Sequence, residues 1–326
     1  MKRRKFITLL GVATAAWPLA AQAQVAQQRS VPLIGLLSGL SSGRGVNDFL
    51  QGLKESGFVE GQNVKIESRF ASGHYDQLPV LAAELMEKKV AVIATLGENA
   101  AKAAQAASGG VIPVVFSLGD DPVSLGLVAS LNRPGRNVTG SISVGHTLGP
   151  KRVELLREFL PNASTVALLT NPKQPREFER RDVENKVRTV GWQLRYLTAS
   201  SIDDFDEVFK ALVRDRIGGL IIANETFFFS EIGRLASLAS NYAVPALGPL
   251  RAFPDAGGLM SYGAPIPEVT RMAGVYTGRV LKGDKPAELP VMQPTKFELV
   301  INGKAAKELN LTIPITLQVA ADEVID

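Results

Sequence analysis

Short apolar runs alternate with amphipathic stretches along most of this 326-residue chain. The runs are rich in Val, Ile and Leu and have the length of buried strands, whereas the amphipathic stretches follow the 3.6-residue period of helices. This alternation predicts an α/β fold with parallel sheets that carry helices on both faces. In the first half we expect strands over residues 32–37, 64–70, 90–96, 113–116 and 137–142, and helices over 46–56, 76–88 and 100–107.

The stretch 113–140 shows how this pattern produces a candidate site. A strand ends at Phe116, and the polar residues after it lie where open α/β sheets bind ligands, outside the carboxyl ends of the strands. We expect Asp121 to cap a helix over 122–131, because Pro122 at the first helical position gives up no needed N–H. Taken alone, the stretch is equally compatible with an ordinary connection between a strand and a helix.

The second half repeats the rhythm of the first, with similar spacing between successive strand ends. We expect strands over 165–170, 193–197, 219–223 and 244–247, and helices over 148–159, 177–190, 203–214 and 230–242. Two such runs predict two Rossmann-like lobes with parallel sheets. A second, independent domain is the alternative, but the connection over 140–150 is short for a flexible linker.

The residues after the second run are expected to return to the first lobe. They read as a turn at 261–263, a helix over 265–281, a strand over 297–301 and a short helix over 303–309. We therefore assign residues 30–143 and 265–326 to lobe 1 and residues 146–262 to lobe 2. Two or three crossings between the lobes would form a hinge.

The N-terminus has the pattern of an export signal peptide over residues 1–23. Four basic residues, with Arg3 and Arg4 adjacent, precede an apolar stretch over 6–20 and a small-x-small site ending at Ala23, as in twin-arginine or general export signals. As a helix the apolar stretch would rise roughly 22 Å, less than the bilayer core of about 30 Å, which argues against a membrane anchor. We therefore expect a periplasmic protein whose signal is cleaved, more consistent with twin-arginine than with general export.

Charge and cysteine content exclude several classes of function. The formal net charge is +4, but residues 1–23 carry four basic side chains and no acidic one, so the remaining chain is neutral. Without a basic surplus, nucleic acid is not an expected partner. The chain has no cysteine, which excludes disulfides, thiolate metal sites, a cysteine nucleophile and a lipid anchor on cysteine.

The chain offers few residues for catalysis. His74 and His146, its two histidines, fall in different predicted lobes. Ser143 lies near a Gly-x-Ser-x-Gly pattern but lacks the leading glycine, and the glycine-rich segment 39–45 lacks the Gly-Lys-Ser/Thr ending of a phosphate-binding loop. No His, Asp or Glu cluster has metal-ligand spacing. We expect no metal, no cofactor and no enzymatic activity, with a hydrolase as the minor alternative.

Short polar side chains remain as the candidate site, because they recur at strand ends in both halves. Such groups, together with helix N-termini, can hold a carboxylate or another anion. Each alone is more commonly a turn or cap residue, but their recurrence favours a cleft between lobes. The candidates are Ser38, Thr95, Ser117 and Ser141 in the first lobe and Asn171, Asn224 and Glu225 in the second.

Further candidates supply charge and aromatic surface. Glu225 and Asp121 can contact a ligand ammonium group, although a helix cap is the favoured role for Asp121. Of the three consecutive aromatics after the strand at 219–223, we take Phe227 as the candidate that stacks on a ligand, with loop packing as the alternative. Tyr262, at the predicted hinge, either closes over the cleft or is a structural hinge residue.

The chain resembles the solute-binding proteins of ABC importers, in the group related to tryptophan- and tyrosine-binding lipoproteins. The resemblance covers nearly all of the chain after residue 23. The residues that carry it are Asp121-Pro122-Val123, Pro134-Gly135, Asn137-Val138-Thr139-Gly140, Asn171-Pro172, the string from Gln293 to Asn302 and the ending from Ala321 to Ile325.

The resemblance implies a type I periplasmic binding protein, a Venus-flytrap fold that captures a small molecule between its lobes. Some members bind aromatic amino acids, so an amino acid-like ligand or a small aromatic or organic acid is expected. The chain departs from the family at Asn224-Glu225, where an aspartate-asparagine pair is common, and in lacking the lipid-anchor cysteine. We expect a monomer that delivers its ligand to ABC permease subunits, with a periplasmic sensing module for a receptor as the alternative.

Overall fold

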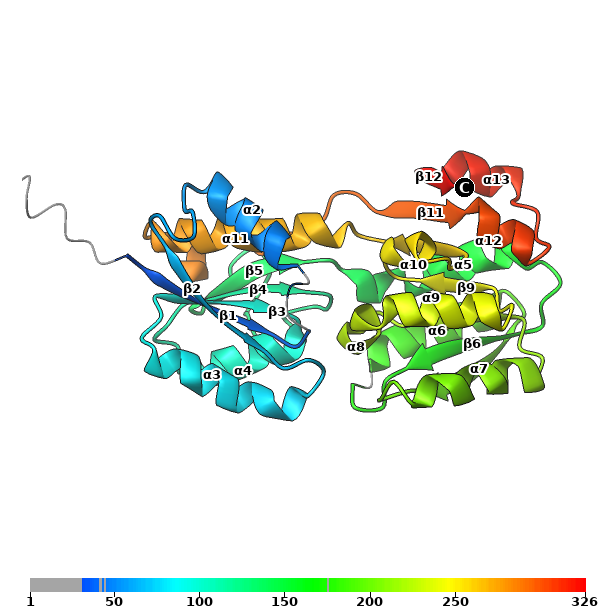
Figure 1. The fold of residues 1–326 in the computed structure, drawn as a ribbon, viewed down its shortest axis with the longest axis horizontal. Helices are drawn as coiled ribbons and strands as arrows, with labels where there is room; N and C mark the ends of the chain where they lie inside the picture. The colour runs from blue at the N-terminus through cyan, green and yellow to red at the C-terminus, as the bar shows by residue number, and fades with distance from the viewer. Residues whose placement is uncertain (1–30, 41–42, 44, 175) are drawn as a thin grey trace, which may run out of the picture.

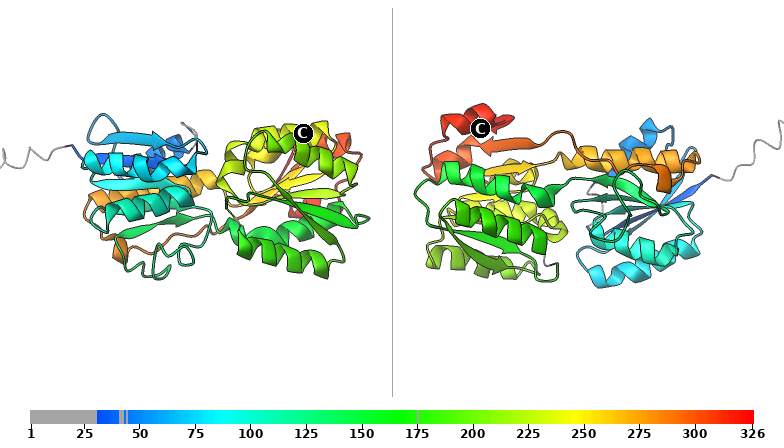
Figure 2. Two further views of the ribbon diagram at one scale, coloured as in Figure 1. Left: turned by 90° about the horizontal axis from the view of Figure 1, so that it is seen from below. Right: turned by 180° about the vertical axis from the view of Figure 1, so that it is seen from behind.

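The computed structural model describes residues 31–40, 43, 45–174 and 176–326. The predicted export signal lies outside these described residues. The chain forms two lobes that lie side by side (Figure 1). Views from below and from behind show the same two bodies joined by narrow connections (Figure 2). Among the described residues, no helix has both the length and the apolar character needed to span a membrane.

The first lobe is built on a parallel five-stranded sheet in the order β2-β1-β3-β4-β5. Its central strands consist almost entirely of buried residues, as expected for a sheet covered on both faces. The strands are β1 (Leu33–Ser38), β2 (Lys65–Phe70), β3 (Val92–Leu96), β4 (Val114–Leu118) and β5 (Val138–Ile142).

Helices cover both faces of this sheet. The apolar sides of α3 (Leu78–Glu87) and α4 (Glu98–Ser108) bury Leu85 and Ala104 in one cluster with alternate strand residues. The opposite face carries α2 (Val46–Glu55) and α11 (Ile266–Leu281), which bury Phe49 and Tyr276 in a separate cluster. The first lobe is therefore completed by a helix from late in the chain.

Three glycines allow α2 and α11 to cross at backbone contact. A Cβ added at Gly52 would lie 1.7 Å from the backbone oxygen of Arg271, and one at Gly274 would lie 2.0 Å from that of Phe49. A Cβ at Gly278 would lie 2.3 Å from Cβ of Ser56. Because no larger residue fits at these positions, the close crossing fixes the position of α2 relative to the sheet.

The second lobe contains a seven-stranded sheet in the order β12-β11-β10-β9-β8-β6-β7. Its parallel part, β7-β6-β8-β9-β10, repeats the 2-1-3-4-5 order of the first sheet, which confirms the predicted repetition. The strands are β6 (Thr165–Thr170), β7 (Gln193–Thr198), β8 (Gly219–Ile222), β9 (Ala246–Gly248), β10 (Met260–Gly263), β11 (Glu298–Asn302) and β12 (Glu323–Ile325).

The helices of the second lobe enclose one large apolar core. Phe205, Phe228 and Phe253 are fully buried in it together with the central strands. The helices are α5 (Gly149–Phe159), α6 (Glu177–Thr189), α7 (Asp204–Arg214), α8 (Thr226–Ser230), α9 (Ile232–Asn241), α10 (Ala252–Asp255), α12 (Gly303–Glu308) and α13 (Ile315–Ala320).

Three segments connect the lobes, over residues 143–148, 264–265 and 293–297. The first segment contains Val144 in the left-handed region, with φ of 46°, a rare conformation for a β-branched residue. Before the third crossing the chain still packs on the first lobe, where Met292 forms a β-bridge with Ser141 of β5. The predicted fold class, two Rossmann-like lobes joined by several crossings, is confirmed.

The C-terminal segment departs from the predicted domain division. The helix α11 lies on the first lobe, but β11 and β12 extend the second sheet, so assigning all of 265–326 to lobe 1 is wrong. The predicted turn at 261–263 is instead strand β10. Because β11 enters from the opposite lobe, it pairs antiparallel with β10, and the second sheet is mixed rather than parallel. Local periodicity carries no information about which sheet edge a strand joins.

The helix predicted over 122–131 does not form, and the segment is a series of turns. The Asp121 carboxylate accepts the N–H groups of Val123 and Ser124, at 3.0 and 3.2 Å, as in the start of a helix. The Ser124 hydroxyl then donates to the Asp121 backbone oxygen, and Gly126 adopts a φ of 71°. These local bonds compete with helical ones. The apolar Leu127 is nevertheless fully buried, which explains the helix-like pattern.

Candidate functional site

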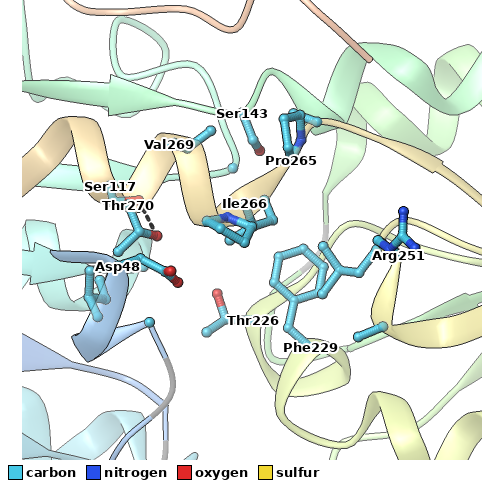
Figure 3. A pocket seen from close by; sticks show the side chains of 18 of the residues that line it. Asp48, Ser117, Ser143, Thr226, Phe229, Arg251, Pro265, Ile266, Val269 and Thr270 are labelled. Carbon is cyan, nitrogen blue, oxygen red and sulfur yellow. Dashed lines mark hydrogen bonds between the residues drawn. The ribbon is translucent and has the colours of Figure 1, made fainter. Parts of the chain in front are cut away.

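A cavity of about 410 Å³ lies between the two lobes. Its walls come from the carboxyl ends of first-lobe strands, the start of α11, and α8 and α10 of the second lobe (Figure 3). The lining residues include Leu40, Asp48, Leu96, Gly97, Ser117, Leu118, Gly119, Ser143, Thr226, Phe229, Leu250, Arg251, Ala252, Asp255, Ala264, Pro265, Ile266, Pro267, Val269, Thr270 and Glu298.

Most of the cavity wall is apolar, and a few polar groups interrupt it. The Ser117 hydroxyl lies 3.4 Å from that of Thr270, so β4 and α11 present a pair of hydroxyls on one wall (Figure 3). The Ser143 hydroxyl is buried and has no hydrogen-bond partner among the described residues. An apolar cleft with a few convergent polar groups is the usual form of a small-molecule site.

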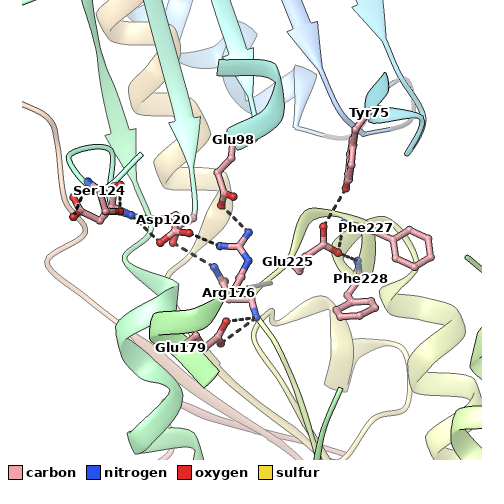
Figure 4. Close-up of polar contacts among 12 residues, drawn as sticks. Tyr75, Glu98, Asp120, Ser124, Arg176, Glu179, Glu225, Phe227 and Phe228 are labelled. Atoms are coloured by element: carbon pink, nitrogen blue, oxygen red, sulfur yellow. Dashed lines mark hydrogen bonds and ion pairs between the residues drawn. The ribbon is translucent and has the colours of Figure 1, made fainter. Parts of the chain in front are cut away.

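Hydrogen bonds cross directly between the lobes beside the cavity, among them the bond from Tyr75 to Glu225 (Figure 4). The Tyr75 hydroxyl donates to Glu225 Oε1 at 3.2 Å, and Asn224 Nδ2 donates to the Gly119 backbone oxygen at 3.3 Å. Burial, reinforced by the charge of Glu225, raises the pKa of Tyr75, so its hydroxyl remains a donor at neutral pH. These contacts require the lobes to be close together.

A charged cluster also joins the lobes. The Arg176 guanidinium of the second lobe pairs with Glu98 at 2.6 Å and with Asp120 at 2.9 Å in the first lobe (Figure 4). The side chains of Arg176 and Glu98 are 7% and 9% exposed, so water screens this pair weakly. Burial opposes the charge of Arg176, but the attraction of Glu98 and Asp120 outweighs it and leaves the pKa of Arg176 raised. Burial also raises the pKa of Glu98, although the positive charge of Arg176 acts to lower it.

A buried ion pair in the second lobe supports Asn224 from behind. Glu179 accepts the Asn224 backbone N–H, with its two oxygens 3.1 and 3.2 Å away, and pairs with Arg152 at 3.3 Å. Arg152 also donates from Nε to the Tyr262 backbone oxygen at 2.9 Å. Because both charges are fully buried and hydrogen-bonded, this pair fixes the strand end that carries Asn224.

The structure places the second-lobe candidates Asn224 and Glu225 at the contact between the lobes rather than in the cavity wall. Glu225 Oε2 accepts the N–H groups of Phe227 and Phe228 at the start of α8, at 2.9 and 3.3 Å, while Oε1 accepts from Tyr75. Glu225 is therefore a helix cap and a bridge at once. Of the candidate residues, only Ser117 lines the cavity.

The other small polar candidates form local bonds. Ser38 accepts from the Leu40 N–H at 3.0 Å, and Asn171 accepts from the Lys173 N–H at 3.0 Å. The Ser141 hydroxyl donates to the Val269 backbone oxygen at 2.7 Å and thereby anchors α11 on the sheet. Thr95 is fully buried in β3, and its hydroxyl has no partner among the described residues. Asp121 holds the turn described above.

The aromatic candidates are also placed differently from expectation. The Phe227 ring stacks on Phe205 at 5.5 Å within the second lobe, while Phe229 lines the cavity. Tyr262 lies in β10, 6.2 Å from the Phe297 ring between centroids, and does not close over the cavity. The α8 helix starts at Thr226 and turns Phe229, not Phe227, toward the first lobe.

Sequence reasoning missed the residues that helices contribute to the cleft. Asp48 of α2 and Thr270 of α11 face the cavity only because the two helices cross closely above the sheet. Arg176 lies in a charged loop without a distinguishing motif. Ser143 directly follows a predicted strand, the same signal that selects Ser117, so the sequence does contain an indication of its role.

Comparison with known proteins identifies relatives across nearly the whole chain. The family model described as ABC transporter substrate binding protein matches residues 30–325. A tyrosine-binding protein of Clostridioides difficile (strain R20291) is 22% identical over 289 residues, which cover 87% of this chain and 82% of that protein.

Solved structures share the fold. One, described as an ABC domain in complex with L-Trp from Streptococcus pneumonia, has a TM-score of 0.81 and 22% identity, covering 91% of this chain and all of that one. A ligand-free, open structure of a substrate binding protein with adhesive properties from Clostridium difficile has a TM-score of 0.64 and 20% identity, covering 91% and 99%.

Proposed function

Because the chain belongs to the family of ABC transporter substrate-binding proteins, we propose that it captures a small organic ligand between its lobes and delivers it to the permease of an ABC importer. The observation that carries the proposal is the cavity lined by both lobes, with direct polar contacts between the lobes at its edge. The predicted export signal supports action in the periplasm.

Capture follows from the geometry of closure. A ligand that touches both walls binds the closed form better than the open one, and therefore shifts the population toward closure. The bonds from Tyr75 to Glu225 and from Arg176 to Glu98 exist only when the lobes meet, so they add to the stability of the closed form. Micromolar affinity corresponds to about −8 kcal/mol, which several hydrogen bonds and one stacked ring can supply. Nothing in this step requires a covalent bond to change.

The L-Trp and tyrosine named for the related proteins support an amino acid or another aromatic compound as the first ligands to test. Phe229 supplies a ring on the cavity wall, and Ser117, Ser143 and Thr270 supply hydroxyls. A permease would recognise the closed form, because its exposed surface differs from that of the open form.

A thermal-shift screen tests the proposal directly. We expect at least one member of a panel of amino acids, aromatic acids, amines, sugars and polyols to raise the melting temperature. At a ligand concentration of 100 times the Kd, the stabilisation is about 2.7 kcal/mol, or on the order of 5 °C. Calorimetry should then give one ligand per chain. Turnover of the ligand, or no response to any panel member, would contradict simple capture.

Replacing Gly119 by alanine should weaken the binding of any ligand found in this way by about 10- to 100-fold. A Cβ at Gly119 would lie 2.6 Å from Asn224 Nδ2 in the opposite lobe, so the clash arises only in the closed form. The melting temperature of the unliganded protein should change little.

A double-mutant cycle with Asn224→Ala provides the control for this clash. If the two side chains collide, Gly119→Ala should cost much less affinity in the Asn224→Ala background than in the native one. Equal losses in both backgrounds would mean that Gly119 acts elsewhere.

A further inference from the structure

Among the described residues that line the cavity between the lobes, acidic groups outnumber basic ones. Among the described lining residues, Asp48, Asp255 and Glu298 are acidic and Arg251 is the one cation. Arg251 already forms ion pairs, with Glu323 at 2.6 Å and with Asp255 at 3.5 Å, and its side chain is exposed at the rim of the cavity. Asp255 is thus paired, and Glu298 lies 3.8 Å from Lys296, so the described wall offers a ligand the charge of Asp48 and no available cation.

Asp48 is the acidic group best placed to meet a ligand. It lies in the first turn of α2 and is half-buried, and its carboxylate forms no hydrogen bond or ion pair with another described residue. It points into the space in front of Thr226 and the Phe229 ring (Figure 3). A ligand that displaces water from this space leaves the Asp48 carboxylate desolvated, which is unfavourable unless the ligand provides a hydrogen-bond donor.

Of the helix starts at the cavity, those of α8 and α11 are unsuited to bind an anion. The first N–H groups of α8 are satisfied by the Glu225 carboxylate, at 2.9 and 3.3 Å. The start of α11 contains Pro265 and Pro267, which have no N–H to donate. Neither helix start can therefore hold a carboxylate as free helix N-termini do.

The remaining wall fits an uncharged body. The Phe229 ring and the side chains of Leu96, Leu118 and Ile266 line the cavity, and an aromatic ring also attracts a cation over its face. The buried Ser143 hydroxyl, which is 2% exposed and has no partner among the described residues, adds one hydrogen-bonding group.

We propose that the captured ligand is a small organic cation, an aromatic or branched apolar body whose protonated amine pairs with Asp48. This inference rests on the proposed capture function and specifies the ligand class for the same cleft. It differs from the acid expected from the sequence, because the strand-end hydroxyls thought to hold an anion are mostly engaged in local bonds.

Matched sets of ligands test the charge preference by calorimetry on the purified protein. Each set shares one body: 2-phenylethylamine, phenylalanine and 3-phenylpropionate; tryptamine, tryptophan and indole-3-propionate; isoamylamine, leucine and 4-methylpentanoate. We expect the amine of at least one set to bind tightest, at least about 10-fold tighter than its acid. An acid or an amino acid that binds more tightly than every amine would overturn the proposal.

The Asp48→Asn variant tests the residue. It should lose at least about 10-fold in affinity for the amine and nothing for the acid, with an unchanged melting temperature without ligand. Asp206→Asn is the matched control, because Asp206 also lies in the first turn of a helix, α7, but is exposed and is not among the residues that line the cavity, and it should change amine affinity less than 2-fold.

Two outcomes separate this inference from the function on which it rests. A preference for the amine that survives Asp48→Asn, or no binding by any amine, refutes the cation proposal. The capture function itself fails only if the wider thermal-shift panel, with its sugars and polyols, also gives no binding.

Discussion

Replacing Arg176 by alanine should weaken ligand binding by about 100-fold or more and leave the unfolding temperature of the unliganded protein nearly unchanged. Arg176 pairs with Glu98 at 2.6 Å and with Asp120 at 2.9 Å across the cleft. Removing one partner of a buried ion pair costs about 3–5 kcal/mol, since the other charge stays buried and uncompensated. In an open form the two carboxylates regain water, so the loss falls on closure and hence on affinity.

The pH dependence of the variant gives an independent readout. Burial already raises the pKa of Glu98 in the closed form, and Arg176 opposes that effect. Without Arg176 the pKa of Glu98 in the closed form should rise further, because the attraction of the guanidinium is lost and the negative charge of Asp120 remains nearby. A group whose pKa is raised by closure favours the closed form at low pH and opposes it as pH rises. Ligand affinity of the variant should therefore recover as the pH is lowered toward 5.

Arg181→Ala is the matched control, since Arg181 lies on α6 with its side chain 66% exposed, and its contacts, with Asp182 at 3.9 Å and the Phe178 ring at 5.3 Å, stay within that helix. We expect its affinity and melting temperature to equal those of the native protein. Calorimetry and thermal unfolding, each with and without ligand, distinguish the cases. A large drop in the melting temperature of the unliganded Arg176→Ala protein would assign the cluster to folding instead of closure.

The sequence predicted the alternating core of both lobes because that part of the fold is encoded locally. β6 has the bounds expected for it, and the 2-1-3-4-5 order recurs as the repeated spacing implied. The predictions from sequence fail where contacts between residues far apart in the chain determine the structure. The turns after Pro122 bury Leu127 without a helix, and β11 and β12 join the second sheet although a helix on the first lobe precedes them.

The site was predictable only at the level of the sheet edge. Strand ends of both lobes do face one cleft, as the positions of Ser117 and Asn224 show. The side chains that complete it come from helices and loops whose orientation depends on packing. Asp48 illustrates the limit, since in sequence it is an ordinary acidic residue in the first turn of a helix, and only the crossing of α2 over α11 brings it to the cavity.

That crossing makes the strongest prediction for stability. Replacing Gly274 by alanine should lower the free energy of unfolding by about 3 kcal/mol, near the upper end of the usual penalty for overpacking. The added Cβ would lie 2.0 Å from the Phe49 oxygen and 2.8 Å from the Leu53 nitrogen. Both atoms belong to the backbone, so no change of rotamer relieves the clash and the helices must separate.

Urea unfolding of Gly274→Ala beside Gly233→Ala separates this packing effect from the general effect of a methyl group in a helix. A Cβ at Gly233 meets no atom within 4 Å, so alanine there should stabilise α9 by about 0.5–1 kcal/mol through its better helix propensity. The two substitutions are chemically identical and should act in opposite directions. If Gly274→Ala unfolds at the same urea midpoint as the native protein, α2 and α11 do not approach each other as closely as the structure shows. Separated helices would also move Asp48 away from the cavity, so the same variant should weaken the binding of an amine that pairs with it.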